Sequence, residues 1–341
     1  MRVAGPSLRA HTLADARVDA LFAPLEGRAL LIAVSGGPDS TALLLMAAEW
    51  AARGGTARLA VATVDHRLRE ESASEAASVA ALAGRLGVPH ATLVWTDAKP
   101  ATRLMERARE ARYRLLIEHA RAIRSEAIVT AHHANDQAET VLFRLLRGSG
   151  LAGFAGIAAM SQRGDVTIAR PLLRVPKGAL IAFCRARGVP FVEDPTNAEP
   201  AYARTRLKPL LAGLAEEGLD ADGFARFARR MAEADEAIER AAAELDARLA
   251  AQGPIDARGL AAAPIAVVQR VLIRRIAAAG GRGESRIGLE QVEALATRLI
   301  DALAVGRPMA ANVAGALVRL TAKGALGFGP EPARRGRSRE A

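Results

Sequence analysis

Residues 29–40 read ALLIAVSGGPDS, and the helix-like run from Thr41 to Trp50 follows them directly. An apolar run, then two glycines, then a helical pattern predicts a strand, a tight turn and the start of a helix. In that arrangement the backbone N–H groups of the turn and the positive end of the helix macrodipole point at one spot. We therefore predict a phosphate-binding loop between the strand and the helix.

The residues of this loop suit a bound phosphate or pyrophosphate. The two glycines let the backbone approach an anion closely, the serines supply hydroxyl donors, and the aspartate supplies a carboxylate. The loop lacks the lysine of a G-x-x-x-x-G-K-[ST] motif, so it is a different kind of phosphate loop. The alternative is an ordinary strand-to-helix turn in which Asp39 or Ser40 caps the helix. We expect the ligand to be held by Ser35, Gly36, Gly37, Pro38, Asp39 and Ser40.

Around this loop, short apolar runs alternate with longer helical patterns. The alternation predicts an α/β fold, a parallel sheet with helices on both faces. Ligands of such sheets lie beyond the carboxyl ends of the strands. The glycine-rich stretch 147–165 is expected to be a mobile loop or a turn-rich connector. Strands are expected at Ala29–Val34, Leu59–Val64, Ala91–Trp95 and Ala127–Ala131, and helices at Ser40–Ala52, Glu71–Leu86, Leu104–Ile123 and Asp136–Leu146.

The 341 residues are enough for two domains. We expect an N-terminal leader over residues 1–20, a first domain over 21–215, a second domain over 216–330 and a basic disordered tail over 331–341. The second domain is expected to be mainly helical, because residues 222–251 form one long alanine-rich, charged helical pattern. Two short strands are expected within 309–328.

Composition narrows the class of protein. The net charge of +10, with 47 Lys+Arg against 37 Asp+Glu, fits a polyanionic partner such as nucleic acid. The alternative is an arginine-rich composition without a binding role. Cys184 is the single cysteine, which excludes a disulfide framework within the chain and fits a reducing cytoplasm. No apolar run approaches the roughly 18 residues of a membrane span, so no membrane partner is expected.

Two small polar clusters are candidates for ligand contacts. Asp65 and His66 follow the second expected strand, where they could meet a ribose or a base edge; the alternative is a plain polar turn. Arg109 and Arg112 are three residues apart and share one face of the third expected helix. Two guanidinium groups on one face can clamp a phosphate, whereas the alternative is a solvated face with internal Glu–Arg pairs.

The fourth expected strand ends in the densest polar stretch, AHHANDQAET at residues 131–140. Asp136 and Glu139 lie three residues apart, so a helix that begins here carries both carboxylates on one face. Such a pair can hold Mg²⁺ or a substrate ammonium group. Zinc is disfavoured because the spacing is not H-E-x-x-H and no cysteine is near. A capping box built from Asp136 and Glu139 is compatible with ligand binding.

Together these motifs resemble the N-type ATP pyrophosphatase superfamily, whose members split ATP into AMP and pyrophosphate. Within it, the chain resembles the tRNA(Ile)-lysidine synthetase family. Asn135 stands where that family often has aspartate, and Thr205 where it often has asparagine. Beyond SGGPDS, the family's motifs occur in order as VDHRLR (64–69), ERAREARY (106–113), AHHANDQAET (131–140), RLLRGSG (144–150), RPLL (170–173) and EDPTN (193–197), followed by Arg204 and Arg206.

The resemblance implies a Rossmann-like PP-loop adenylation domain followed by a tRNA-binding C-terminal domain. It implies that ATP and Mg²⁺ are used to adenylate O2 of the wobble cytidine in an isoleucine tRNA with anticodon CAU. The ε-amine of free L-lysine then attacks C2 and expels AMP, which gives lysidine. The modified tRNA reads AUA and accepts isoleucine.

The resemblance also implies roles for individual residues. Asp39 and Asp136 would hold Mg²⁺, and Asp65 and His66 would contribute to ATP binding. Both His133 and Glu139 are open as acceptors of the proton that the lysine amine loses. The implied catalytic set is Asp39, Arg112, His133, Asp136 and Glu139, and the implied tRNA contacts are Arg109, Arg204, Arg206 and Lys208.

Three other functions use parts of the same pattern. Thiolation of tRNA on the same fold generally needs several cysteines, and this chain has one. Amide ligation of a small molecule would not need the basic excess or the C-terminal extension. A basic RNA-binding module without catalysis would not need the carboxylates at 39, 136 and 139. The sequence leaves a homodimer open.

Overall fold

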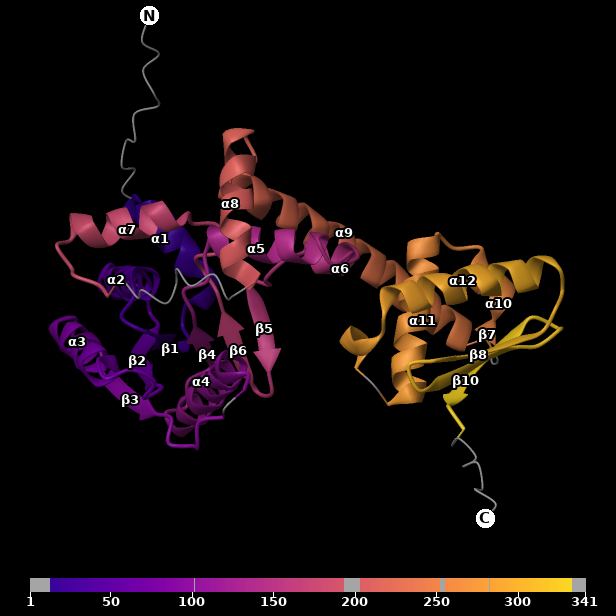
Figure 1. The fold of residues 1–341 in the computed structure, drawn as a ribbon, viewed down its shortest axis with the longest axis horizontal. Helices are drawn as coiled ribbons and strands as arrows, with labels where there is room; N and C mark the ends of the chain where they lie inside the picture. Colours follow the sequence, from indigo (N-terminus) through magenta and orange to yellow (C-terminus); the bar gives the residue numbers. More distant parts are fainter. Residues whose placement is uncertain (1–12, 101, 193–202, 252–254, 282, 333–341) are drawn as a thin grey trace, which may run out of the picture. The chain divides into compact units, whose positions relative to one another are not determined.

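The computed structural model describes residues 13–332 apart from 101, 193–202, 252–254 and 282 (Figure 1). Its described residues form two compact units, one within 1–147 and 155–229, the other within 148–154 and 230–341. The division falls inside a long helix, between Arg229 and Arg230. The predicted boundary after residue 215 stays a prediction. Most of the predicted leader and of the predicted basic tail lies outside the described residues.

The first unit is built on a six-stranded sheet in the order β3-β2-β1-β4-β6-β5. The first five strands in this order pair in parallel, and β5 pairs with β6 antiparallel. The predicted α/β fold class is therefore confirmed. The strands are β1 (Ala29–Ala33), β2 (Arg58–Asp65), β3 (His90–Val94), β4 (Ala127–Val129), β5 (Met160–Arg163) and β6 (Val166–Ala169).

Alternation along the strands gives the sheet two buried faces. Leu30 and Ile32 point to one face, whereas Leu31 points to the other. Four helices pack on the first face and α4 covers the second (Figure 1). The helices of the first face are α1 (Asp15–Phe22), α2 (Pro38–Ala52), α3 (Ser72–Arg85) and α7 (Lys177–Ala186), and α4 spans Leu104–Ala122.

The stretch 147–165, predicted as a mobile loop or turn-rich connector, contains the short helix α6 (Leu151–Phe154) and strand β5. The side-chain amide of Gln137 fixes the segment before β5, because it donates to the Ile157 carbonyl at 2.8 Å and accepts from the Ile157 N–H at 2.6 Å. Neither β5 nor β6 was predicted. Both are four residues long, and β5 reads MSQR with little burial, so its sequence carries no strand pattern.

Two further helices of the first unit are α5 (Ala134–Leu145), which follows β4, and α8 (Ala203–Glu216). They pack together, with Leu207 of α8 buried against Ala138 and Val141 of α5. Phe224 and Ala228, from the first part of α9 (Ala221–Ala250), complete this small core. The packing explains why α8 presents its charged residues outward, beside the helix that carries the polar stretch 131–140.

The second unit is mainly helical with a small antiparallel sheet, as predicted in outline. The sheet has four strands in the order β7-β10-β9-β8, where two were expected. Arg270 pairs with Asp235, and Arg274 with Glu239, so charged pairs join α9 to α11. The elements after α9 are β7 (Ile255–Asp256), α10 (Ala257–Ala261), α11 (Ile265–Gly280), α12 (Leu289–Ala304), β8 (Met309–Val313), β9 (Ala316–Leu320) and β10 (Ala325–Pro330).

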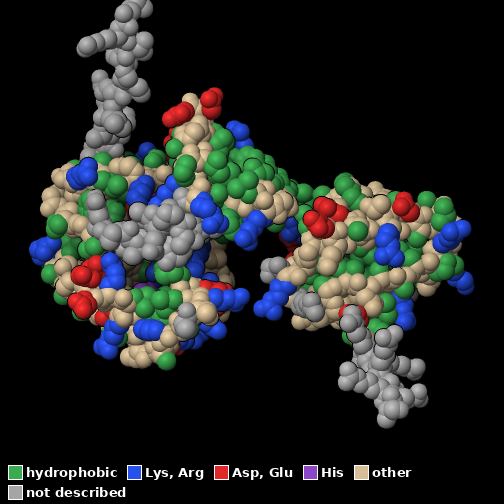
Figure 2. All heavy atoms as spheres, viewed as in Figure 1, with side chains coloured by type: hydrophobic (Ala, Val, Ile, Leu, Met, Phe, Trp, Pro, Cys, Tyr) green, Lys and Arg blue, Asp and Glu red, His purple; other side chains and the backbone are tan. Residues whose placement is uncertain are grey.

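Charge is distributed over both units. Lys and Arg side chains are spread over the visible face of each, whereas Asp and Glu side chains gather in fewer places (Figure 2). The excess of positive charge is thus not confined to the C-terminal end. Among the described helices, none combines the length and the apolar character that crossing a membrane requires.

Candidate functional site

Three helices of the first unit begin close to one another at the predicted loop. α2 begins at Pro38 after β1, α5 begins at Ala134 after β4, and α7 begins at Lys177. The Ala134 N–H donates to the Val175 carbonyl at 3.0 Å, and the Lys177 N–H donates to Asn135 Oδ1 at 2.9 Å. The starts of α5 and α7 are therefore hydrogen-bonded together. Positive helix ends gathered in this way favour an anion.

The loop has a backbone conformation that requires glycine at its first turn position. Gly36 has φ of +89°, which side-chain-bearing residues rarely adopt. Gly37 is the N-cap of α2 and no side chain caps this helix, so neither Asp39 nor Ser40 has the capping role considered as the alternative. Instead Ser40 Oγ accepts from the Ser35 N–H at 3.1 Å and lies 3.2 Å from Ser35 Oγ. The two hydroxyl groups are thus held side by side.

His133 lies between the two predicted metal ligands. Its Nε2 is 3.4 Å from Asp39 Oδ2, and its Nδ1 is 3.6 Å from Asp136 Oδ2. Asp136 Oδ2 also accepts from the His133 N–H at 2.9 Å, so it closes the start of α5. Burial by itself lowers the pKa of His133, but the hydrogen bond to Asp39 and the negative charges of Asp136 and Asp39 outweigh it and raise the pKa. The histidine is stabilised in its charged form.

Asp39 has a free coordination position. Its Oδ1 is buried and has no hydrogen-bond partner in the described structure, while its Oδ2 faces His133 and Lys177. A buried carboxylate oxygen without a partner is costly unless a ligand satisfies it. Across the described ranges no three His, Cys, Asp or Glu side chains come together as a metal site. The partnerless Oδ1 of Asp39 fits a cation such as Mg²⁺, which typically takes one or two carboxylates together with phosphate and water oxygens.

Lys177 is a site residue that the sequence reasoning missed. Its Nζ lies 3.7 Å from Asp39 Oδ2 and its side chain is 44% exposed. It supplies, from the start of α7, the positive charge that the loop itself lacks. A signal for it exists in the sequence, because a lysine in the first turn of a helix opposes the macrodipole and calls for a nearby anion.

Asp65 is the last residue of β2 and His66 follows it, and the structure brings Arg112 to His66. Arg112 Nε donates to His66 Nε2 at 3.4 Å. Burial, then the charges of Arg112 and Lys99, lower the pKa of His66 to about 4. The ring is therefore neutral at pH 7, with its proton on Nδ1, which is buried and has no partner within the described part of the chain. Asp65 is buried and accepts from the Arg67 N–H at 2.8 Å, so it also shapes the turn.

The other predicted residues are placed less closely. Glu139 is half-buried, one turn after Asp136 on α5. Arg109 is exposed, one turn before Arg112 on α4. Arg206 and Lys208 are exposed on α8. The side chain of Arg204 and the EDPTN motif at 193–197 lie outside the described residues.

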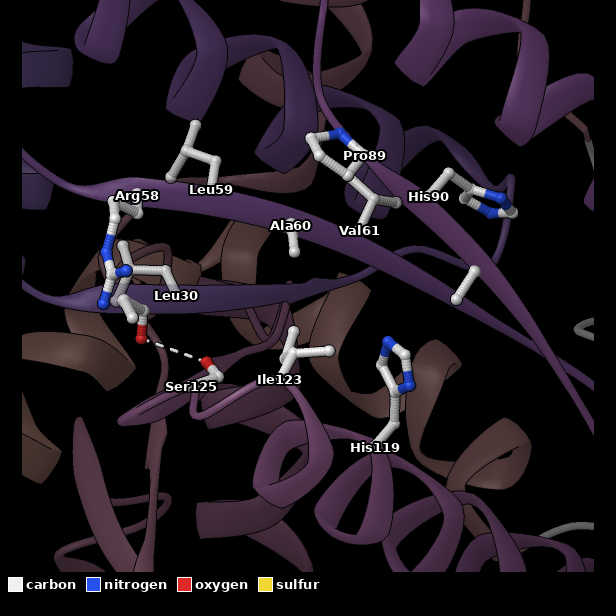
Figure 3. Close-up of a pocket in the computed structure, with 12 residues that line it drawn as sticks. Leu30, Arg58, Leu59, Ala60, Val61, Pro89, His90, His119, Ile123 and Ser125 are labelled. Atoms are coloured by element: carbon white, nitrogen blue, oxygen red, sulfur yellow. Dashed lines mark hydrogen bonds between the residues drawn. The ribbon is translucent and has the colours of Figure 1, made fainter.

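A cavity of about 330 Å³ lies at the end of the same sheet where its parallel strands begin (Figure 3). None of the predicted site residues lines it. It opens between the amino ends of β1, β2 and β3 and the last turns of α4. Ser125 at its wall donates to the Ala29 carbonyl at 3.0 Å. The wall is mainly apolar, so it differs in chemistry from the loop site. The cavity is lined by Ala29, Leu30, Arg58, Leu59, Ala60, Val61, Pro89, His90, Ala91, His119, Ile123 and Ser125.

Comparison with known proteins identifies the family. A family model described as a PP-loop domain matches residues 10–213. The tRNA(Ile)-lysidine synthase of Methylobacterium nodulans is 47% identical, over 94% of this chain and 95% of its own. The chain belongs to the tRNA(Ile)-lysidine synthase family. The resemblance drawn from the motifs is thereby confirmed.

Further members of the tRNA(Ile)-lysidine synthase family support this assignment. The protein from Methylobacterium sp. strain 4-46 is 50% identical over 90% of both chains, and the protein from Bradyrhizobium diazoefficiens is 46% identical over 92% of this chain and 93% of its own. Among solved structures, a U34-tRNA thiolase from Methanococcus maripaludis has a TM-score of 0.56 and 13% identity, and covers 64% of this chain and 78% of that one. At that identity the likeness shows a shared fold alone.

Proposed function

We propose that this protein ligates free L-lysine to C2 of the wobble cytidine in an isoleucine tRNA with anticodon CAU. The products are lysidine, AMP and pyrophosphate, and the intermediate is the tRNA adenylated at O2 of that cytidine. The similarity to tRNA(Ile)-lysidine synthases over 90–94% of the chain carries the proposal. We expect the reaction to take place in the cytoplasm, and a homodimer stays a prediction.

Binding of the ATP phosphates falls to the loop and to the gathered helix ends. The backbone N–H groups around Gly36 and Gly37 would contact the β- and γ-phosphates, since they sit at the positive end of α2. Ser35 and Ser40 hold their hydroxyl groups beside the same loop. Lys177 would offset the charge of the pyrophosphate as it leaves. These groups favour cleavage between the α- and β-phosphates because they stabilise the leaving group.

Asp39 and Asp136 would hold Mg²⁺, which neutralises phosphate charge when it is bound. The partnerless Oδ1 of Asp39 supports this assignment. In the absence of the ion, His133 and Lys177 are the positive groups that face Asp39. Either carboxylate could also receive the ammonium group of lysine, together with Glu139 on the same helix.

The electrostatics favour Glu139 over His133 as the group that accepts the proton from the lysine amine. Despite its burial, the hydrogen bond to Asp39 and the charges of Asp136 and Asp39 raise the pKa of His133, which favours the charged form over the form that accepts a proton. Glu139 is half-buried, one turn after Asp136 on the same helix, and a carboxylate can accept a proton. His133 would then act by positioning Asp39 and Asp136.

Thiolation is disfavoured by the environment of Cys184. Its thiol is buried in α7 and donates to the Pro38 carbonyl at 3.5 Å. Burial and the charge of Asp39 raise the pKa of this thiol to about 11, so it is a poor source of thiolate. Sulfur transfer by the cysteine of this chain is therefore unfavourable.

The test is whether ATP cleavage depends on the wobble cytidine of the tRNA. The protein is incubated with ATP, L-lysine and a CAU-anticodon isoleucine tRNA transcript, and release of AMP and pyrophosphate is measured. The proposal expects release with this transcript and none when the wobble cytidine is changed to uridine. Release that is equal for the two transcripts would contradict it.

A further inference from the structure

Four arginines of the first unit lie at or next to the buried Tyr113. None of these arginines has a carboxylate partner among the described residues. Arg163 Cζ lies 4.1 Å from the centroid of the Tyr113 ring, and Arg109 Cζ lies 5.3 Å from it. Arg170 interacts with the Tyr113 side chain, and Arg112 precedes Tyr113 on α4 and donates to His66. We propose that these four arginines, the Tyr113 cluster, bind the backbone phosphates of single-stranded RNA beside the reacting base. The proposal rests on the proposed function for the identity of that RNA, the anticodon loop of the tRNA.

The lack of acidic partners sets these arginines apart from their neighbours. On the same helix, Arg107 pairs with Glu110 at 3.0 Å, Arg114 with Asp97 at 2.5 Å, and Arg121 with Asp165 at 2.6 Å. In the described structure no carboxylate pairs with any arginine of the Tyr113 cluster. Like charges that lie close together repel each other, and an opposite charge between them offsets that repulsion. Four positive charges close together, with no carboxylate partner among the described residues, favour an anion.

The arginines of the Tyr113 cluster come from three separate parts of the fold. Arg109 and Arg112 come from α4, Arg163 ends β5, and Arg170 follows β6. Arg170 Nη1 donates to the Ala158 carbonyl at 2.8 Å and to Ser161 Oγ at 3.0 Å, which fixes its guanidinium group. Its Nε is buried and has no hydrogen-bond partner in the part of the chain that the structure describes. This donor is thus not satisfied by the described residues.

Charge and position favour RNA phosphates over the phosphates of ATP. Desolvation and the like charge of Arg109 lower the pKa of Arg112, and Arg109 and Arg163 add to the desolvation that lowers the pKa of Arg170. Only negative charge relieves that repulsion. The ATP phosphates already have the loop at the start of α2. Arg112 also contacts His66 at the end of β2, so the Tyr113 cluster continues from the predicted nucleotide site.

The test compares Arg163→Gln with Arg107→Gln. Both variants remove one exposed positive charge from the same part of the unit, but Arg107 already has an acidic partner. Binding of the CAU-anticodon transcript is measured without ATP between 50 and 200 mM salt. Loss of one phosphate contact makes the slope of log K against log salt shallower by about 0.7–0.9, and weakens binding at 50 mM salt by about tenfold. We expect this for Arg163→Gln, whereas Arg107→Gln keeps the slope of the natural protein.

Two further measurements distinguish loss of a phosphate contact from misfolding of the variant. Thermal unfolding midpoints of the variants check that each folds, and Arg163→Lys, which keeps the charge, is expected to keep the slope. Equal slopes for Arg163→Gln and Arg107→Gln would overturn the proposal, as would an unchanged slope with a raised KM for ATP. The natural protein could bind the transcript with a steep slope that Arg163→Gln makes shallower, and yet form no lysidine. In that case the proposed function is wrong, but the Tyr113 cluster still binds RNA phosphates.

Discussion

Replacing Lys177 by methionine tests the role of the positive charge that α7 brings to the loop. Its Nζ lies 3.7 Å from Asp39 Oδ2, and its side chain is 44% exposed. Two unit charges at this separation interact by about 1 kcal/mol in water and about 4.5 kcal/mol at an effective dielectric constant of 20. Partial exposure places the value between these limits, nearer the lower, at about 2 kcal/mol. We take the interaction of Lys177 with the departing pyrophosphate to be of the same size, about 2 kcal/mol. Its loss lowers kcat/KM for ATP by about 30-fold.

The assay is initial-rate release of pyrophosphate at saturating tRNA and lysine. Lys177→Arg keeps the charge and is expected to stay within a few-fold of the natural protein, and Lys323→Met, an exposed lysine of the second unit, is the matched control. The charge of Lys177 also lowers the pKa of His133, so Lys177→Met is expected to raise that pKa in an NMR titration. Unchanged kcat/KM in Lys177→Met, together with the raised His133 pKa, would refute the role in pyrophosphate departure.

Three other outcomes follow from the structure. Asp136→Ala is expected to abolish turnover while tRNA binding stays nearly unchanged, which filter binding and product analysis check; retained activity would remove the metal and lysine roles. Gly36→Ala forces a side chain into φ of +89°, so we expect a loss of about 1–3 kcal/mol in the free energy of unfolding, measured by urea denaturation. His66, with its pKa lowered to about 4, binds protons less readily than in the unfolded chain. Its stabilisation is therefore present above about pH 6.5 and lost as the pH falls toward 4, by about 1–2 kcal/mol after screening. His66→Asn is expected to remove that part of the pH dependence, and identical pH profiles would contradict the burial argument.

Much of the site could be predicted because parallel strands place their carboxyl ends together. The loop after β1 and the polar stretch after β4 are far apart in the sequence, yet β1 and β4 are neighbours in the sheet. That adjacency brings His133 within 3.4 Å of Asp39. The apolar runs and the glycine turn were enough to predict in outline that the loop after β1 and the polar stretch after β4 lie at the same end of the sheet.

The rest depends on tertiary packing that leaves no local pattern. Lys177 reaches Asp39 only because α5 and α7 begin side by side, through the bond between Asn135 and the Lys177 N–H. Arg163 reaches Tyr113 only because β5 folds back along β6, and β5 was too short and too exposed to predict. In the second unit, β7 has two residues, Ile255 and Asp256, and is a strand only by its pairing with β10. Such pairings are set by the partner rather than by the segment.

The most direct test of the proposed reaction is transfer of isotopically labelled L-lysine to the CAU-anticodon isoleucine tRNA transcript. After incubation with ATP, the RNA is digested to nucleosides and the label is located by mass spectrometry. The account predicts one labelled lysine on the wobble cytidine, dependent on ATP and absent from Asp136→Ala. Label that stays entirely free while the natural protein releases AMP and pyrophosphate would contradict lysidine formation.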